Sequence, residues 1–395
     1  MNLVIEIPDA LEASVANVLI PSLKGYTYVS ATNPDAYYSF EMDSGAFCQT
    51  FPMHRTGVKS KKCLRLWVND EARKRNLTHI KNVSGYFNLH KVDYVVKYEY
   101  VEKAFRLNDG TVIPGVVMDW IEGDTLIKYV KKNYKNSSVM RQLAKDFREM
   151  VDYLNRNGMA HGDLSGDNII VTPQRQLYLI DYDSFYVKGQ PDNIPQPTSG
   201  IVAFQHPARR SNRYLNTYMD YFSQQVIYLS LIAIAEKPSL FKEDSDKGLV
   251  FQDADLLSEE ALKSSRAFIN MATIKNKEVQ DRLKDLKEDI GKPFDKVRSL
   301  TAIYDWEKEL ARREEERRNR EKPRVDEIIY PKKDEEPRRV VKTLASYCGI
   351  CGYQFPIATN QAYYCPMCGT QRRTLEQNQL PPWMSDQSPY QGGKK

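Results

Sequence analysis

Two short stretches decide how this sequence is interpreted: His161-Gly-Asp-Leu-Ser-Gly-Asp-Asn168 and, thirteen residues after Asn168, Asp181-Tyr-Asp183. Between them, two short apolar runs flank the turn Pro173–Gln176, which predicts a β-hairpin over 169–180. A carboxylate, an amide five residues later and another carboxylate after a hairpin are what phosphoryl transfer needs. Asp163 would orient the attacking hydroxyl, and Asn168 with Asp181 would hold the divalent ions that bridge nucleotide phosphates. The alternative is a loop with capping Asp and Asn residues, which are common in turns.

The rest of the chain runs from β-rich to α-rich. Strands are expected in three aromatic and β-branched runs of the first hundred residues, namely Tyr26–Ser30, Ala46–Phe51 and Leu64–Val68. Residues 137–157 have the apolar spacing of an amphipathic helix capped by Ser137 or Ser138, and 217–303 are helical in pattern throughout. From 307 to 342, 24 of 36 residues are charged. This predicts a solvated helix up to Lys322 and then a proline-containing linker.

The two deciding stretches resemble the protein-kinase superfamily. His161–Asn168 looks like its catalytic loop, H-R-D-L-x-x-x-x-N, and Asp181–Asp183 looks like its D-F-G metal motif. The resemblance implies that Asp163 is the catalytic base and that Asn168 and Asp181 are Mg²⁺ (or Mn²⁺) ligands. The resemblance covers about 30–300.

Further motifs on both sides extend this resemblance. Asp43-Ser-Gly45-Ala-Phe47-Cys48-Gln-Thr50 is similar to a degraded glycine-rich phosphate loop in which Gly45 and Phe47 remain. Arg65 stands where the family has its phosphate-binding lysine. Met118 resembles the gatekeeper, and Asp119–Ile121 the adenine-binding strand. Downstream, Phe204-Gln-His-Pro207-Ala occupies the place of the A-P-E segment, and Asp220 resembles the aspartate that braces the catalytic loop.

Several positions depart from the family pattern. Ser84 stands where a helix glutamate should pair with the lysine, and Glu71 is the nearest acidic residue. Gly162 replaces the arginine that reads a phosphorylated activation loop, so such phosphorylation is not expected to act as a switch. Ser165 replaces a lysine.

The last departure is Asp183, which replaces the glycine of D-F-G and is interpreted as an auxiliary metal or water ligand. The H-G-D-L and D-[FY]-D forms are similar to aminoglycoside and other small-molecule kinases. The A-P-E-like stretch and Asp220 resemble protein kinases instead, so the chain as a whole resembles a divergent bacterial-type Ser/Thr kinase.

A second motif near the C-terminus consists of two CxxC pairs separated by thirteen residues: Cys348, Cys351, Cys365 and Cys368. Four thiolates at this spacing indicate a structural, tetrahedral Zn²⁺ site in a zinc ribbon. Two disulfides or a rubredoxin-type iron site are the alternatives. The ribbon would serve protein–protein interaction or intramolecular docking. The alternative is a nucleic-acid surface built from Arg372, Arg373 and the tyrosines at 347, 353, 363 and 364.

Composition excludes other classes of protein. The net charge of +5 over 395 residues is too small to argue for nucleic acid by itself. The longest apolar run, Val226–Ala235, is half the length of a membrane span, and the N-terminus lacks a basic signal-peptide region. Metal-type cysteine usage indicates a reducing, cytoplasmic compartment. Cys48 is interpreted as a small buried residue, and His54, His79, His90 and His206 as ordinary surface or loop residues.

The expected fold is therefore α+β. A bilobal protein-kinase-like domain spans 1–303 (N-lobe about 1–118, C-lobe about 122–303), followed by a charged helix and linker (304–341), a zinc ribbon (342–373) and a disordered tail (374–395). The expected function is ATP-dependent phosphorylation of a protein Ser or Thr in bacterial-type signalling or stress response. The alternatives are a pseudokinase scaffold and a small-molecule kinase. By resemblance, partners include a protein substrate, a cognate phosphatase and a von Willebrand A-type protein.

Overall fold

The computed structural model describes residues 2–45, 47–242 and 248–321, together with Thr343–Leu344, Gln354 and Thr374–Leu375. The chain divides into two units, Met1–Glu315 and Glu316–Lys395. The second unit contributes one described strand pair, β12 (Thr343–Leu344) with β13 (Thr374–Leu375). The four cysteines of the predicted zinc ribbon and residues 376–395 of the predicted disordered tail lie outside the described residues. The prediction of disorder is wrong for Thr374–Leu375, which pair with β12.

The N-terminal lobe is built on an antiparallel sheet with strand order β1-β3-β4-β6-β5, in which β2 also pairs with β3. The strands are β1 (Thr27–Tyr28), β2 (Asp43–Ser44), β3 (Cys48–His54), β4 (Lys62–Trp67), β5 (Tyr98–Arg106) and β6 (Val112–Asp119). Of these, β1, β3 and β4 coincide with the three runs predicted from the sequence. Two helices complete this lobe: α1 (Leu3–Ala13), which was not predicted, and α2 (Asp70–Leu89), which the resemblance implied only through the helix position of Ser84.

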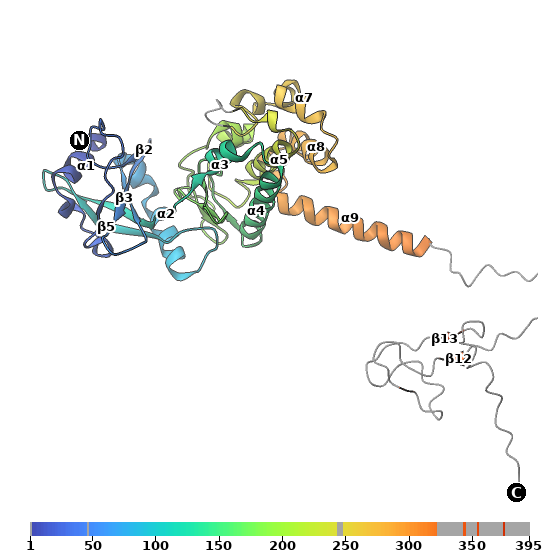
Figure 1. The fold of residues 1–395 in the computed structure, drawn as a ribbon, viewed down its shortest axis with the longest axis horizontal. Helices are drawn as coiled ribbons and strands as arrows, with labels where there is room; N and C mark the ends of the chain where they lie inside the picture. Colours follow the sequence, from blue (N-terminus) through green and yellow to red (C-terminus); the bar gives the residue numbers. More distant parts are fainter. Residues whose placement is uncertain are drawn as a thin grey trace, which may run out of the picture. The chain divides into compact units, whose positions relative to one another are not determined.

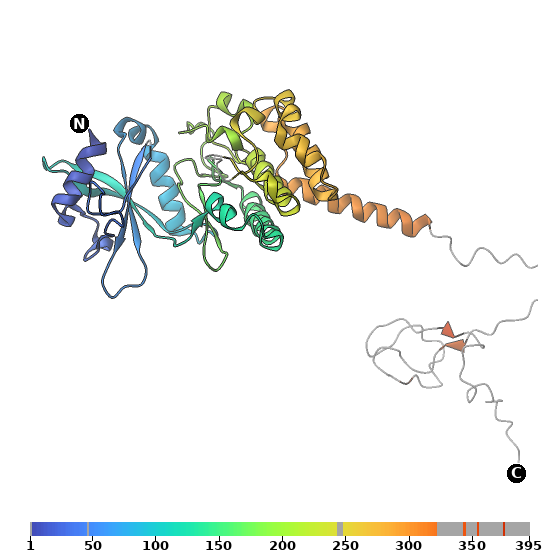
Figure 2. The same cartoon turned by 45° about the horizontal axis from the view of Figure 1, so that its top comes forward.

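The sheet separates two apolar clusters. On β4, Leu64 and Leu66 pack with α1 in one cluster, whereas Cys63 and Trp67 pack with α2 in the other. Because side chains alternate across a strand, Arg65 lies on the α2 side. Figures 1 and 2 show α1 and α2 on opposite sides of the strands. Arg65 therefore points toward Asp181 in the C-terminal lobe.

The C-terminal lobe is mostly helical. Its principal helices are α3 (Leu126–Asn133), α4 (Ser137–Arg156), α5 (Tyr221–Glu236), α6 (Glu259–Ser264), α7 (Arg266–Ala272), α8 (Lys277–Ile290) and α9 (Leu300–Glu321). Its strands are β7 (Asp124–Thr125), β8 (Met159–Ala160), β9 (Ile169–Val171), β10 (Leu177–Leu179) and β11 (Tyr186–Val187). The 3₁₀ turns among the described residues are η1 (Val15–Asn17), η2 (Pro21–Leu23), η3 (Val202–Phe204), η4 (Pro207–Ser211), η5 (Pro238–Leu240), η6 (Asp253–Leu256) and η7 (Phe294–Lys296).

The predicted amphipathic helix and hairpin are both present. Helix α4 begins at Ser137, although Asn136 rather than a serine caps it, since its side chain accepts the backbone N–H of Val139. Strands β9 and β10 pair antiparallel around the expected turn. The hairpin therefore separates the catalytic-loop motif from Asp181, as the spacing predicted.

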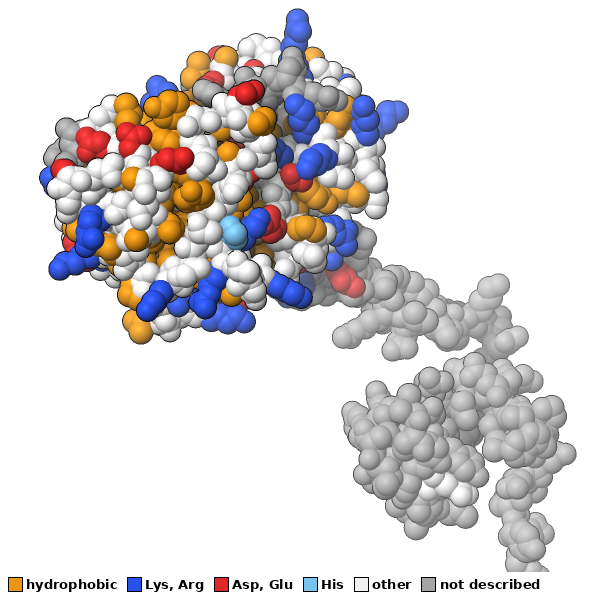
Figure 3. All heavy atoms as spheres, turned by 60° about the vertical axis from the view of Figure 1, so that its left-hand side comes forward, with side chains coloured by type: hydrophobic (Ala, Val, Ile, Leu, Met, Phe, Trp, Pro, Cys, Tyr) orange, Lys and Arg blue, Asp and Glu red, His pale blue; other side chains and the backbone are white. Residues whose placement is uncertain are grey.

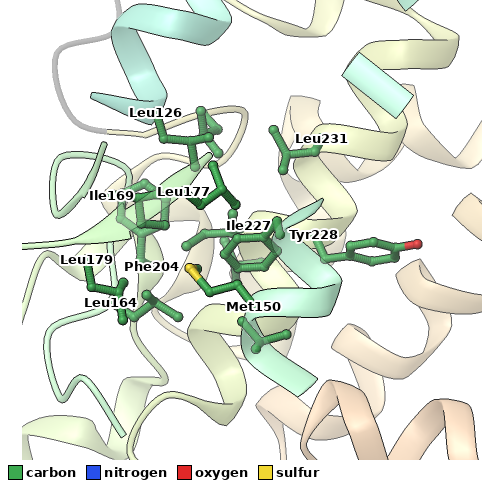
Figure 4. Packing of buried hydrophobic residues seen from close by; sticks show 14 of the residues in the cluster. Leu126, Met150, Leu164, Ile169, Leu177, Leu179, Phe204, Ile227, Tyr228 and Leu231 are labelled. Atoms are coloured by element: carbon green, nitrogen blue, oxygen red, sulfur yellow. The ribbon is translucent and has the colours of Figure 1, made fainter. Parts of the chain in front are cut away.

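Helix α5 forms the centre of the C-terminal lobe. Every residue from Phe222 to Ala235 is buried. Figure 4 shows Ile227 and Leu231 of this helix beside Met150 of α4 and Leu177 of β10. The apolar run of α5 is thus a core helix, and no helix in the described part of the chain is long and apolar enough to cross a membrane.

The start of helix α9 is fixed to the lobe by Tyr304. Its ring is contacted by the guanidinium groups of Arg148 and Arg282, at 4.6 and 4.8 Å from the ring centroid. Its hydroxyl contacts Tyr228 (2.9 Å) and Glu278. The charged helix predicted up to Lys322 therefore exists, and its first turns belong to the packed lobe.

On the face drawn in Figure 3, the described lysine and arginine side chains are scattered among apolar and acidic ones. A nucleic-acid surface is usually a clustered basic patch. This face does not have that character.

Candidate active site

The catalytic-loop motif is fixed by Asp220, the residue that precedes α5. Its carboxylate, 2% exposed, accepts the backbone N–H groups of His161 and Gly162, the latter at 3.0 Å. His161 Nε2 lies 2.7 Å from the carbonyl oxygen of Ile180, which ties the loop to the end of the hairpin. Within the loop, Asn168 Nδ2 donates to the carbonyl oxygen of Asp163 at 2.8 Å. The arrangement is the brace that the sequence predicted for Asp220.

Gly162 has a local reason to be glycine. Its φ is +80°, and a Cβ atom at this position would lie 2.3 Å from the carbonyl oxygen of Ser184. L-residues with side chains rarely adopt such a φ, and the contact leaves no space for one. The loop in this conformation therefore excludes the arginine found at this position in the resembling family.

A buried arginine that the sequence analysis missed supports the same loop. Arg209, in η4, is 1% exposed and donates through Nη2 to the carbonyl oxygen of Gly162. Burial lowers the pKa of Arg209, while the carboxylates of Asp220 and Asp163 act in the opposite direction. One arginine in an irregular segment carries no periodic signal, so sequence alone could not distinguish it from a surface residue.

Arg65 is buried and binds the two acids of the Asp181-Tyr-Asp183 motif. Its Nη2 lies 2.8 Å from Asp181 Oδ1 and 2.9 Å from Asp183 Oδ2, and its Nη1 lies 3.0 Å from Asp183 Oδ1. This is a forked guanidinium–carboxylate pair, a geometry that lysine cannot make. The structure gives Asp183 a role as the partner of Arg65, and its interpretation as an auxiliary metal or water ligand stays a prediction.

Ser84, which stands where the resembling family has a helix glutamate, makes structural contacts instead. Ser84 lies on α2, where its hydroxyl donates to the carbonyl oxygen of Tyr98 (3.3 Å) and accepts the N–H of Tyr100 (2.9 Å). Ser84 thus fastens α2 to β5, and the carboxylate partner of Arg65 comes from Asp183 instead. Arg65 and Asp183 are 118 residues apart in the chain.

Asp181 adopts a left-handed backbone conformation, with φ of +65°. This conformation is uncommon for a residue with a side chain, and such strain concentrates at functional sites. The side chain of Asp181 is 43% exposed. The next residue, Tyr182, is buried and makes edge-on ring contacts with Phe87 of α2 and Tyr98 of β5. This packing fixes the backbone that presents both acids.

Burial perturbs the acids of this site. It raises the pKa of Asp163 to about 6, with the His161 ring acting in the opposite direction. It also raises the pKa of Asp183 to about 6 against the opposing charge of Arg65. Burial acts to lower the pKa of Arg65, but Asp181 and Asp183 raise it well above its usual value. A carboxylate with a raised pKa is a better proton acceptor near neutral pH than an ordinary aspartate.

The acids open onto a cavity of about 300 Å³. It is lined by Phe47 of the β2–β3 loop, by residues of α2, by Asp163, Asp181 and Asp183, and by the segment Pro195–Thr198. Asp163 Oδ1 is buried and has no hydrogen-bond partner among the described residues. The structure thus brings the predicted base, one predicted metal ligand and the predicted phosphate-loop aromatic to one cavity.

The predicted nucleotide residues of the N-terminal lobe lie on neighbouring strands. Met118 is buried opposite Cys63, and Asp119 lies opposite Lys62, with which it forms an ion pair. Ile121 is half-buried and packs on the main core. A second cavity, of about 420 Å³, lies beside Trp120 and is lined by Thr50 and Pro52 of β3 and by residues between 31 and 43.

Gly45 does not have a special backbone conformation. Its N–H donates to the carbonyl oxygen of Cys48 at 2.9 Å, which closes the turn between β2 and β3. A Cβ atom there would make one ordinary contact, of 3.6 Å. The turn itself is where the phosphate loop was predicted, but the glycine is not needed for its backbone.

Asn168 and Asp181 offer oxygen ligands of the kind that Mg²⁺ prefers. The amide nitrogen of Asn168 is used toward Asp163, which leaves the amide oxygen for a cation, and Asp181 is accessible. Magnesium is usually held by one or two such groups plus substrate phosphates. No group of three His, Cys, Asp or Glu side chains suited to a metal ion occurs among the described residues. The residues therefore fit a magnesium ion that arrives with its nucleotide.

One histidine differs from the prediction of surface or loop positions. His79 is buried on α2, at 4% exposed, whereas His206 is a loop residue before η4, although it too is buried, at 3% exposed. Cys48 and Cys63 are buried free thiols, as expected for Cys48. Neither histidine lines the cavity of the three acids.

Comparisons with known proteins show that part of this chain is similar to protein kinases. The family model described as RIO domain matches residues 106–193, which contain Asp163, Asn168 and Asp181. Serine/threonine-protein kinase max-2 of Caenorhabditis elegans is 24% identical over 156 residues, 40% of this chain and 23% of that protein. Serine/threonine-protein kinase 1 of Heliothis zea nuclear polyhedrosis virus is 21% identical over 149 residues, 38% of this chain and 53% of that protein.

A third relative, probable serine/threonine-protein kinase mkcB of Dictyostelium discoideum, is 25% identical over 134 residues, 34% of this chain and 18% of that protein. The alignments thus span between 18% and 53% of these relatives' own lengths. The family match and these similarities, together with the mixed helix and sheet architecture, support membership of the protein-kinase superfamily.

Proposed function

We propose that this protein is an ATP-dependent phosphotransferase that acts on a Ser or Thr hydroxyl of a protein. The observation that carries the proposal is that Asp163 and Asp181 line one cavity and that the buried Arg65 binds Asp181. The names of the similar proteins, all serine/threonine-protein kinases, support it at a coarse level. A role in bacterial-type signalling is part of the proposal and rests on resemblance alone.

In this proposal each residue has a separate task. Asp163, with its raised pKa and unpartnered Oδ1, accepts the proton of the attacking hydroxyl. Asn168 and Asp181 would hold Mg²⁺, which would supply positive charge to the nucleotide phosphates. Arg65, fixed by Asp183, places its positive charge beside Asp181, and the turn at Gly45 covers the phosphates. Positioning and charge neutralisation are most of what this chemistry requires.

A second candidate is a pseudokinase scaffold. The donors of Arg65 are directed to Asp181 and Asp183 rather than left for phosphates, and this observation favours the scaffold. A chain in which Arg65 stays bound to both acids would bind nucleotide weakly and would not turn it over.

Transfer from γ-labelled ATP distinguishes the two candidates. The full chain would be incubated with Mg²⁺ or Mn²⁺ and a generic protein acceptor, beside Asp163→Ala and Asp181→Asn. Asp124→Asn, at an exposed ion pair with Lys132, is the matched control. Label that is lost in the first two variants and kept in the control supports a kinase. Absence of transfer and of ATP turnover from all folded chains would reject the enzyme.

We also propose that Cys348, Cys351, Cys365 and Cys368 hold a structural Zn²⁺ ion. The paired CxxC spacing supports this proposal. Such a small module cannot build an apolar core of its own, so metal binding would drive its folding.

A further inference from the structure

Arg209 holds the peptide group that leads into the candidate base. Its Nη2 donates to the carbonyl oxygen of Gly162, which belongs to the peptide bond between Gly162 and Asp163. The N–H group of Gly162 donates to Asp220 Oδ1 at 3.0 Å. Charged side chains from outside the catalytic loop thus bind both polar backbone groups of Gly162. These two contacts fix the direction in which the backbone enters Asp163.

The turn η4 keeps Arg209 in place. The N–H of Arg209 donates to the carbonyl oxygen of His206 at 2.8 Å, and its own carbonyl oxygen accepts the N–H of Asn212 at 3.1 Å. The guanidinium group lies 5.8 Å from the centroid of the Phe294 ring. A cation within about 6 Å of a ring centroid is attracted to the ring. Arg209 therefore reaches the catalytic loop from a turn whose own position is fixed.

The charge of Arg209 exceeds what packing requires. The side chain is 1% exposed, yet Nε and Nη1 have no hydrogen-bond partner among the described residues. A buried charge is costly unless it is paired, and an apolar side chain often fills such a position with no loss of stability. The carboxylates that act on the charge of Arg209 are those of Asp220 and Asp163. The buried charge therefore points to a role at the catalytic loop.

Asp163 has a complementary need for a nearby cation. It shares the cavity with Asp181 and Asp183, and like charges in one cavity repel each other. Arg65 binds Asp181 and Asp183, but no bond from it reaches Asp163 in the described part of the chain. Asp163 Oδ1 is buried and has no hydrogen-bond partner there. Arg209, bound to the peptide group next to Asp163, supplies a positive charge on this side.

We propose that Arg209 is a positioning residue for phosphoryl transfer, which holds Asp163 in the orientation that accepts the hydroxyl proton. The proposal rests on the phosphotransferase function proposed above. In that step the hydroxyl oxygen forms a bond to the γ-phosphorus, and the bond from this phosphorus to the β,γ-bridging oxygen breaks. ADP leaves with the bridging oxygen, and the hydroxyl proton passes to Asp163.

Arg209 acts on this step through Asp163 alone. It is not among the described residues that line the cavity, so it touches neither the hydroxyl nor the nucleotide. Its bond to Gly162 fixes the backbone, and its charge attracts the carboxylate. Loss of Arg209 should therefore slow the step that follows binding and leave the binding of both substrates unchanged.

The test measures transfer from γ-labelled ATP to a generic protein acceptor, with the full chain and varied concentrations of both substrates. Arg209→Met removes the charge and the donors, and kcat should fall about 10- to 100-fold with KM for ATP unchanged. Arg209→Gln keeps a donor without the charge and should lie between Met and wild type. Arg209→Lys keeps both and should restore most of kcat.

Arg210→Met is the matched control, because Arg210 is the exposed neighbour of Arg209. Its kcat and KM should equal those of wild type. Equal kcat values in Arg209→Lys and Arg209→Met, or in Arg209→Gln and wild type, would overturn the proposal. The comparison of Lys with Gln decides even where Arg209→Met fails to fold. A KM for ATP that rises in proportion to the fall in kcat would also overturn it, since a general loss of structure would have that effect.

A second measurement does not depend on activity. Arg209→Gln, Asp163→Asn and the double variant are compared with wild type by thermal unfolding at mildly alkaline pH. The two substitutions should not be additive, because each charge stabilises the other in the native state. Additive shifts would overturn the attraction between Arg209 and Asp163.

The outcomes separate this inference from the function on which it rests. Transfer by wild type with the same kcat in Arg209→Gln would overturn the inference and leave the kinase in place. Absence of transfer and of ATP turnover from the folded wild-type chain would remove the proposed function, and the positioning role with it.

Discussion

The pair Arg65–Asp183 gives a quantitative prediction. The side chain of Arg65 is 8% exposed and that of Asp183 is 19% exposed, so water screens their two bonds weakly. Hydrogen bonds to a charged group contribute about 1.5–3 kcal/mol each. Asp183→Asn keeps the shape and one acceptor oxygen, and Asp181 still neutralises part of the charge on Arg65. We therefore expect a loss of about 2–3 kcal/mol in the free energy of unfolding, and a fall of roughly 5 °C in the thermal midpoint.

The assay is a double-mutant cycle followed by calorimetry or circular dichroism. Arg65→Gln, Asp183→Asn and the double variant are compared with wild type, and the coupling should be about 2 kcal/mol. Asp124→Asn is the control, because the Lys132–Asp124 pair is 63% and 30% exposed and should contribute less than about 1 kcal/mol. Additive effects of the two single variants would refute the reasoning, since they would mean that Arg65 and Asp183 do not stabilise each other.

Three more perturbations have definite expected results. Burial lowers the pKa of His79 to about 4, and a backbone hydrogen bond of Phe185 opposes this effect only in part. The unfolded chain therefore protonates this histidine from about pH 6.5 downward, whereas the native state resists protonation until about pH 4. Stability should fall by about 3 kcal/mol between pH 6.5 and 4 in wild type, and this part should be missing in His79→Leu. Gly162→Ala should lower the thermal midpoint and abolish transfer, because its Cβ atom would overlap Ser184. Elemental analysis of the full chain should find one zinc per chain, and less in Cys348→Ser.

The controls for these experiments follow from the same structure. Gly110 has a φ of +89° with no atom within 4 Å of an added Cβ, so Gly110→Ala measures backbone strain without overlap. Equal falls in the thermal midpoint of Gly162→Ala and Gly110→Ala would contradict the packing argument at Gly162. Parallel stability–pH curves for wild type and His79→Leu would contradict the burial of a neutral histidine. Full zinc content in Cys348→Ser would contradict its role as a ligand.

The elements that sequence reasoning predicted well have strong local signals. The hairpin Ile169–Leu179 and helix α4 combine regular apolar spacing with turn or cap residues. Asp220 was identified through the resemblance, and its two bonds to the catalytic loop are present. The assignments of the base and of the metal ligands remain predictions, because the geometry brings the residues together without testing their roles.

The features that sequence reasoning missed depend on contacts between distant residues. Helix α2 has a charged first turn and few apolar positions, and the strands around it dominated the interpretation. The partner of Arg65 was sought on that helix, whereas the partner lies 118 residues away at Asp183. Burial of Arg209 and His79 is likewise a property of the packed fold. No local sequence pattern predicts the distant partner of Arg65 or the burial of Arg209 and His79.

The close approach of Gly162 to Ser184 has a consequence for engineering this site. A side chain at 162 would collide with the carbonyl oxygen of Ser184, and Ser184 directly follows Asp183, which Arg65 holds in place. An arginine introduced at 162 alone would therefore have to displace this segment. The residues at 65, 162 and 183 are thus linked by geometry, and a substitution at 162 has to be designed together with the pair.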